Sequence, residues 1–244
     1  LCFSFTLAFL NLTWAQLTVI DTFSATNISD LAETLVGSGV QIFNVQYQCD
    51  NKGLGTFNGN NSNIGINQGI LLTSGYAVTA IGPNDMPGSG NDLSRPGDSQ
   101  IDQIISPNTS QDACILEFDF IPDGDTIKFN YVFASEEYPE YVNAGFNDAF
   151  AFFINGPGVP LQNIAYVPNT NIPVTIDNVN NGGANAGPCQ NCAYYVNNGE
   201  GMTPNINTSI QYDGFTTVLE AKIAVNPCDT YHLKMAVSDV GDGS

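Results

Sequence analysis

One short polar segment carries most of the residues that could do chemistry in this chain. Residues 135–148 read SEEYPEYVNAGFND and contain three glutamates, one aspartate and two tyrosines, with no lysine or arginine. Two further aspartates, Asp239 and Asp242, stand near the C-terminal end of the sequence. Several carboxylate and amide oxygens without basic neighbours suit Ca²⁺, a hard cation that prefers oxygen ligands. We therefore predict a calcium site with ligands from Glu136, Glu137, Asn147, Asp148, Asp239 and Asp242.

The same carboxylates permit two other interpretations. Two carboxylates about 5 to 9 Å apart, on either side of a sugar, are the catalytic groups of a glycosidase. No basic or histidine residue stands beside them in the sequence to shift the pKa values of such a pair. The single histidine, His232, belongs to another predicted strand. In the second interpretation these carboxylates bind neither a cation nor a substrate and are solvated loop residues. We predict no enzymatic activity and keep as the alternative a glycan-active hydrolase using Glu136, Glu137, Glu140 and Asp148.

The tyrosines of this segment favour contact with a sugar. If Tyr138 and Tyr141 are exposed, their rings offer flat faces for a sugar ring, and Asn143 adds a polar side chain beside them. The alternative is that both rings only pack the loop against the domain. We predict a ligand site at Tyr138, Tyr141 and Asn143, with carbohydrate as the ligand class.

Three predicted strands position the acidic segment. Residues 116–120 and 127–133 alternate apolar and polar side chains, and the turn 122–125 between them, Pro-Asp-Gly-Asp, predicts a hairpin. Residues 149–154 are apolar on both faces, which is typical of a central strand covered on both sides. Because the acidic segment joins two neighbouring strands, Glu136 and Glu137 should lie near Asp148 at one edge of a sheet.

The rest of the chain predicts a β-sandwich. Residues 26–36 show helical periodicity, a helical turn is predicted near residues 100–105, and residues 216–225 and 231–237 form a second predicted hairpin. If 231–237 runs in the same sense as 127–133, the last aspartates emerge beside the acidic segment. About ten short strands separated by Gly, Pro and Asn turns indicate a two-sheet antiparallel sandwich of jelly-roll type with one N-terminal helix.

Charge and targeting signals narrow the function. The net charge of −19, from 24 acidic and 5 basic residues, argues against nucleic acid or anionic lipid as a partner and favours cations. Residues 1–15 hold an apolar run too short to span a bilayer, followed by a small-residue step, as at the end of a signal peptide truncated at its start. We expect an exported chain without membrane insertion, with one domain at residues 16–244.

The cysteines fit an exported protein. Disulfides are the default there. Cys189 and Cys192 are three apart in a Gly/Asn-rich loop, and without a second such pair the spacing favours a local disulfide over zinc or redox chemistry. The pairing of Cys49, Cys114 and Cys228 stays open.

Four stretches together carry a family likeness. They are GILLTSG, ACILEFDFIPDGDTIKFNYVFASEEYPEYVNAGFNDAFAFFINGPG, YDGFTTVLEA and PCDTYHLKMAVSDVGDGS. In this combination they resemble the choice-of-anchor L domain of bacterial, largely Bacteroidota, surface proteins. The resemblance implies an exported module whose parent chains end in differing cell-surface anchors or in a type IX secretion sorting signal. It implies no established enzymatic activity, and it places a closing strand and an attachment domain after Ser244.

These observations converge on a secreted or cell-surface β-sandwich module. We expect it to serve adhesion or recognition, to be non-catalytic and calcium-stabilised, and to bind a glycan or surface polymer. A purely structural spacer domain is the remaining alternative beside the hydrolase.

Overall fold

The computed structural model describes residues 16–21, 28–37, 39–182, 187–199 and 208–241. Within these residues the chain forms thirteen strands, two α-helices, α1 (Ile28–Glu33) and α2 (Ser99–Ile105), and two 3-10 turns, η1 (Ala77–Ala80) and η2 (Cys192–Tyr194). The protein is therefore mainly β, as predicted, and its strand pairs are antiparallel, whereas the jelly-roll connectivity stays a prediction. The predicted helix over residues 26–36 is shorter, and the predicted signal segment lies outside the described residues.

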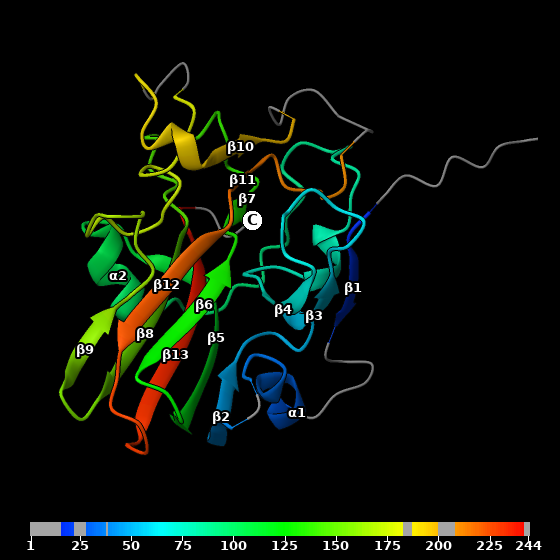
Figure 1. Ribbon diagram of the computed structural model, residues 1–244. Coiled ribbons are helices and arrows are strands. Elements are labelled where there is room, and N and C mark those ends of the chain that lie inside the picture. Colours follow the sequence, from blue (N-terminus) through cyan, green and yellow to red (C-terminus); the bar gives the residue numbers. More distant parts are fainter. Residues whose placement is uncertain (1–15, 22–27, 38, 183–186, 200–207, 242–244) are drawn as a thin grey trace, which may run out of the picture.

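The main sheet has five strands, and the α2 helix covers one of its faces (Figure 1). β8 lies inside this sheet and is buried on both faces. Phe153 packs toward Ile101 of α2, while Phe152 packs into the main hydrophobic core on the other face. The prediction of a strand covered on both sides is therefore confirmed. In spatial order the strands are β2 (Gln41–Gln48), β5 (Ser110–Ile121), β13 (Tyr231–Val240), β8 (Ala149–Gly156) and β9 (Val159–Asn163).

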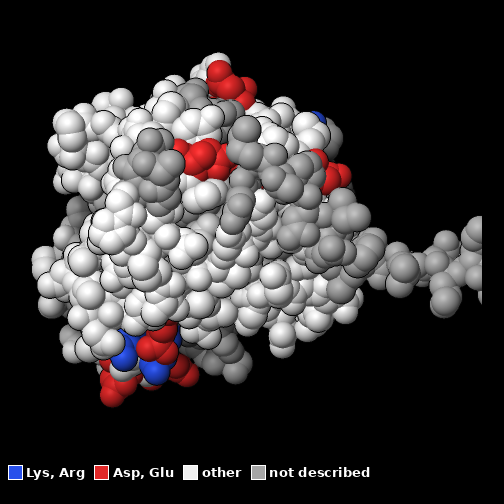
Figure 2. All heavy atoms as spheres, turned by 90° about the horizontal axis from the view of Figure 1, so that it is seen from above, with Lys and Arg blue, Asp and Glu red and all other residues white. Residues whose placement is uncertain are grey.

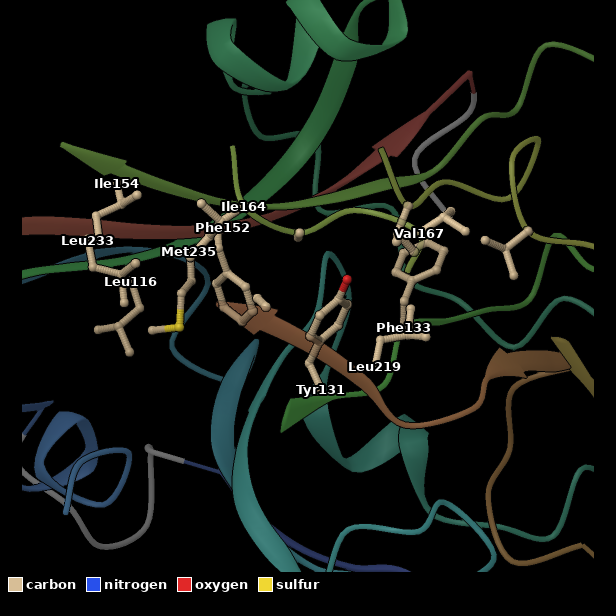
Figure 3. Packing of buried hydrophobic residues seen from close by; sticks show 14 of the residues in the cluster. Leu116, Tyr131, Phe133, Phe152, Ile154, Ile164, Val167, Leu219, Leu233 and Met235 are labelled. Atoms are coloured by element: carbon tan, nitrogen blue, oxygen red, sulfur yellow. The ribbon is translucent and has the colours of Figure 1, made fainter. Parts of the chain in front are cut away.

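A two-stranded cover sheet of β6 (Thr126–Tyr131) and β12 (Leu219–Ala224) packs on the other face of the main sheet (Figure 1). Aromatic rings fill the space between them. The ring centroids of Phe129 and Phe152 are 5.4 Å apart, and those of Tyr131 and Phe150 are 5.2 Å apart. Figure 3 shows Tyr131 and Phe152 reaching toward each other from the two layers. Burial of these rings makes this the largest apolar contact of the fold.

Both predicted hairpins are wrong, because each turn carries the chain from one sheet to the other. β5 pairs with β2 and β13, so both of its edges are occupied, and β6 pairs with β12 instead. The two turns lie side by side and bind each other. The Val225 amide donates to the Asp125 carbonyl at 2.9 Å, and the Cys228 amide donates to the Pro122 carbonyl at 2.9 Å. The turn residues mark a chain reversal correctly but do not specify the sheet of the next strand.

Two small sheets complete the architecture. One joins β1 (Thr18–Asp21), β3 (Leu54–Asn58) and β4 (Gln68–Leu72), and the other joins β10 (Tyr195–Asn197), β11 (Gly214–Thr216) and β7 (Ala134–Ser135). In the second sheet Gly214 stands opposite Ser135. This register places Ser135, at the start of the acidic segment, beside Asp213, although the two residues are 78 positions apart in the sequence.

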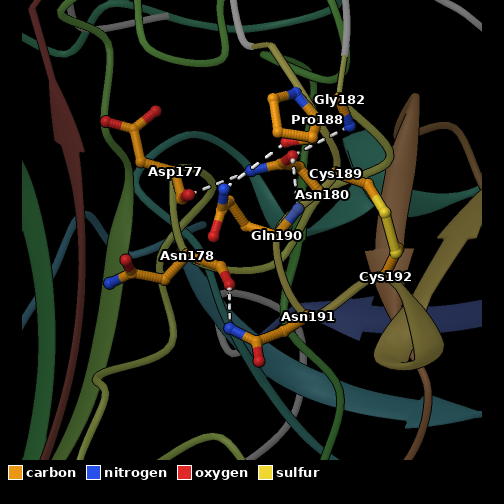
Figure 4. The surroundings of a disulfide bond; sticks show 9 residues. All are labelled: Asp177, Asn178, Asn180, Gly182, Pro188, Cys189, Gln190, Asn191 and Cys192. Carbon is orange, nitrogen blue, oxygen red and sulfur yellow. Dashed lines mark hydrogen bonds between the residues drawn. A yellow bond between two sulfur atoms is a disulfide. The ribbon is translucent and has the colours of Figure 1, made fainter.

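Two disulfides fix loops to this frame. Cys189 and Cys192 are bonded, as predicted, and Cys49 is bonded to Cys114, which answers the open question of their pairing. Among the described cysteines, Cys228 is free and exposed. The loop before Cys189 is held by Asn180, whose side-chain oxygen accepts from the amides of Gly182 and Gln190 at 2.9 and 3.3 Å (Figure 4).

Candidate functional site

A cavity of about 440 Å³ lies where β4, β6, β8 and β13 approach one another. Two kinds of side chain line it. Aromatic and aliphatic groups come from the cover sheet and the main sheet, among them Phe129, Phe150 and Phe152. Carboxyl and hydroxyl groups come from the acidic segment and from the ends of the strands next to it, namely Ser135, Glu136, Asp148, Tyr212, Ser238 and Asp239. The cavity is therefore amphipathic, a common property of small-molecule sites.

Asp148 holds three strands together at this cavity. It stands directly before β8, and its Oδ2 accepts a hydrogen bond from Ser135 Oγ at 2.8 Å, at the end of β7. Its Oδ1 accepts from the Val240 amide at 3.1 Å, at the end of β13. The register of β8 and β13, with Ala149 opposite Ser238, brings Asp239 into hydrogen-bond contact with Asp148 as well. The predicted convergence of Asp148 and Asp239 is therefore present.

Burial raises the pKa of two acidic groups of the cavity, Glu136 and Asp148. Burial raises the pKa of Glu136 to about 9, and the nearby charges of Asp213, Glu137 and Glu140 add to this, while the Ser89 backbone opposes it. Burial also raises the pKa of Asp148 to about 8, helped by Glu137 and opposed by the hydrogen bonds that Asp148 accepts. A carboxyl in such a place releases its proton to solvent only above neutral pH or when a cation binds beside it.

Three residues of the cavity lining carry buried polar side-chain atoms, although the pairing of Ser238 with Ala149 turns the Ser238 hydroxyl toward the α2 face of the main sheet. The three groups are the carboxyl of Glu136, the hydroxyl of Tyr131 and the hydroxyl of Ser238, and each of the three residues lines the cavity. In the described part of the chain none of these atoms makes a well-formed hydrogen bond. Because a buried polar atom without a partner costs free energy, such atoms in native proteins call for an explanation. Such atoms beside a cavity are available to pair with a polar ligand or with water.

The other predicted calcium ligands are placed differently. Glu137 is buried next to Asp148 but lies outside the lining of the cavity. Asn147 points to another loop, where its side-chain oxygen accepts from the Asp177 amide at 3.1 Å. Asp242 lies outside the described residues. Among described residues, no three or more His, Cys, Asp or Glu side chains are grouped so that they could hold a metal ion. The calcium site stays a prediction.

Of the three predicted sugar-contact residues, Tyr138 is buried, whereas Tyr141 and Asn143 are exposed. The expectation that Tyr138 is exposed is wrong, because its side chain is fully buried, its hydroxyl donates to the Val179 carbonyl at 2.7 Å and its ring packs on Tyr195. Tyr141 is 44% exposed and its ring contacts Phe146. Asn143 is exposed at a left-handed φ of 58°, and its amide donates to Asp177 at 2.5 Å. Only Tyr141 and Asn143 face solvent.

Sequence reasoning missed the residues that come from other elements. Tyr212 adjoins Glu136, Asp239 and Asp148, whose charges act together with burial to raise its pKa to about 12. Its neighbour Asp213 is fully buried, and its Oδ1 accepts from Asn84 Nδ2 at 2.6 Å. The Tyr-Asp-Gly run at residues 212–214 was visible in the sequence. Its place beside Glu136 follows only from the pairing of β7 with β11.

Much of the acidic charge near this site is internal. Seen from above, one face of the molecule shows Asp and Glu in a few separate groups among many uncharged residues (Figure 2). Five acidic side chains are instead buried around the cavity, namely Glu136, Glu137, Asp148, Asp213 and Asp239. In the part of the chain that the structure describes, no helix has the length and apolarity needed to cross a membrane.

Comparison with known proteins agrees with this architecture at the level of the family. Neither a curated protein nor a solved structure matches the chain. The model of the choice-of-anchor L domain matches residues 19–244, which include every strand in full except β1, whose first residue, Thr18, lies just before the match. A match over this length shows that the chain belongs to the choice-of-anchor L domain family.

Proposed function

We propose that the chain is an exported, surface-associated module that recognises a carbohydrate in the cavity without converting it, for adhesion or recognition. Membership of the choice-of-anchor L family supports the surface association. The observation that carries the ligand class is the lining of the cavity, which combines aromatic rings with carboxyl and hydroxyl groups. Sugars have the matching surface, because a sugar ring presents C–H groups on its faces and hydroxyls along its edge.

A glycan array combined with a broad hydrolase screen tests this proposal. We expect binding without turnover. Phe150→Ala should weaken binding, because the Phe150 ring lines the cavity, whereas Phe43→Ala should leave it unchanged, because Phe43 is 37% exposed on β2 and outside the cavity lining. Melting temperatures of both variants show that they fold. No binding to any glycan would favour the structural spacer, and equal binding by the two variants would place the glycan elsewhere.

A glycan-active hydrolase is the second candidate function. It is favoured by one observation, namely that burial raises the pKa of both Glu136 and Asp148 beside the same cavity. A carboxyl that stays protonated at neutral pH is what a general acid requires. Turnover in the screen that Glu136→Gln abolishes, without loss of binding, would establish this function in place of recognition alone.

The calcium prediction is tested separately from glycan binding. If Glu136, Glu137, Asp148 and Asp239 share an ion with a dissociation constant of about 0.1 mM, a few millimolar calcium adds about 2 kcal/mol to the free energy of unfolding. The melting temperature would then be roughly 4 to 8 °C higher in calcium than in EDTA, with a much smaller effect of magnesium. Equal melting temperatures would mean that protons and hydrogen bonds alone hold these carboxyls.

A further inference from the structure

We propose that the cavity selects a sugar that carries a free amino group, with the ammonium nitrogen bound at Glu136. This inference rests on the proposed carbohydrate function, for which it names the ligand class. It starts from one side chain: Glu136 is only 7% exposed and lines the cavity, and the Ser89 backbone approaches its carboxyl without forming a well-aligned hydrogen bond. A carboxylate accepts hydrogen bonds only, and an ammonium group has three N–H donors and the opposite charge.

The charges around Glu136 favour a cationic group. The charges of Asp213, Glu137 and Glu140 act on it, and Asp148 and Asp239 line the same cavity. The one basic residue of the lining is Lys128, whose side chain is 59% exposed and pairs with Glu220 at 3.7 Å. A positive ligand group therefore enters a region of several acidic groups and one outward-facing lysine. A negatively charged ligand would be repelled there.

The remaining groups of the cavity distinguish an amino sugar from a simple amine. The hydroxyl of Tyr131, which also lines the cavity, is a second buried polar atom without a hydrogen bond among the described residues, and a hydroxyl group of a ligand can pair with it. The rings of Phe129 and Phe150 supply apolar surface for the body of a ring. An alkyl or cycloalkyl amine would fill the apolar part but leave the Tyr131 hydroxyl without a partner.

Calorimetric titration in EDTA at pH 7 tests the inference with four probes: glucosamine, glucose, N-acetylglucosamine and cyclohexylamine. We expect glucosamine to bind most tightly. Glu136→Gln should weaken its binding by about tenfold to hundredfold, which is typical for loss of a hydrogen bond to a charged group. Glu33→Gln makes the same chemical change on the exposed face of α1 and should have no effect.

Each outcome separates the inference from the proposal beneath it. Equal binding of glucose, N-acetylglucosamine and glucosamine would overturn the amino-group inference and keep the carbohydrate proposal. Binding of cyclohexylamine as tight as that of glucosamine would keep the ammonium contact and overturn the sugar. Failure of all four probes, or glucosamine binding that Glu136→Gln does not weaken, would overturn the inference, and the glycan array would then decide the carbohydrate proposal on its own.

Discussion

Replacing Glu136 by glutamine is expected to raise the free energy of unfolding at pH 8 by about 2 to 4 kcal/mol and to change it little at pH 5. Glutamine has nearly the shape of a protonated glutamate but no ionisable group. The variant gains stability because it avoids a cost that the wild-type protein has. At any pH between its unfolded and folded pKa values, Glu136 has to take up a proton on folding, and this proton uptake lowers the free energy of unfolding. The pKa of this buried carboxyl is raised from 4.5 to about 9.

The sign of the pH dependence follows from proton counting. Between pH 4.5 and about 9 the folded protein holds a proton on Glu136 that the unfolded chain has lost. The free energy of unfolding therefore decreases as pH rises through this window, by at most about 1.4 kcal/mol per pH unit for one group. Asp148 acts in the same direction, since burial raises its pKa from 3.8 to about 8. The protein should be more stable at pH 5 than at pH 8.

Urea unfolding at pH 5 and pH 8, in EDTA, measures this effect. Glu136→Gln should flatten the pH dependence, whereas Glu33→Gln, on an exposed helical face, should keep the wild-type slope. Asp148→Asn is a poorer choice, because the Asp148 carboxyl also accepts hydrogen bonds from Ser135 and Val240. A wild-type protein that gains stability from pH 5 to pH 8 would show that Glu136 is ionised in the folded state.

The fold shows which parts of a β-sandwich a sequence can specify. Alternation of apolar and polar residues located β5, β6, β12 and β13. Partner choice was wrong at both turns, because turn residues such as Pro122 to Asp125 fix a reversal of the chain and leave open whether the next strand pairs or crosses to the other sheet. Pairing of β5 with β13 and β6 with β12 depends on contacts about 100 residues apart, as in the partners Leu116 and Met235.

The candidate site shows the same limit. The convergence of Asp148 with Asp239 was predictable, since both stand at ends of strands that border each other. The burial of Tyr138 was not, because loop residues of the same type can face solvent or the core, and its contacts, Val179 and Tyr195, lie in distant loops. Charge alone suggested calcium ligands or, alternatively, solvated loop carboxylates. Burial of Glu136 instead raises its pKa, so that this carboxyl binds a proton at neutral pH.

Removal of the Asp98 carboxyl is expected to cost about 3 to 5 kcal/mol, because it leaves a buried lysine without its ion partner. Asp98 is buried at the start of α2, where its Oδ1 accepts hydrogen bonds from the amides of Gln100 and Ile101 at 3.0 and 3.2 Å. Its Oδ2 accepts from Lys234 Nζ at 2.5 Å, and the Lys234 side chain, on β13, is only 13% exposed. This pair ties α2 to the middle of the main sheet.

A set of variants divides this cost between helix capping and ion pairing. Asp98→Ala loses both. Asp98→Asn keeps an acceptor for the helix amides but removes the charge, so it should lose the ion-pair contribution and retain the cap contribution. The cap contribution is about 1 kcal/mol, and Asp98→Asn should therefore be more stable than Asp98→Ala by about this amount. Asp98→Ala combined with Lys234→Met removes the stranded cation and should recover most of the stability, since replacing a buried ion pair by apolar groups is often neutral. Thermal and urea unfolding measure all three. If Asp98→Ala and the double variant are equally unstable, the loss comes from the helix cap and packing, and the buried ion pair contributes nothing to holding α2 on the sheet.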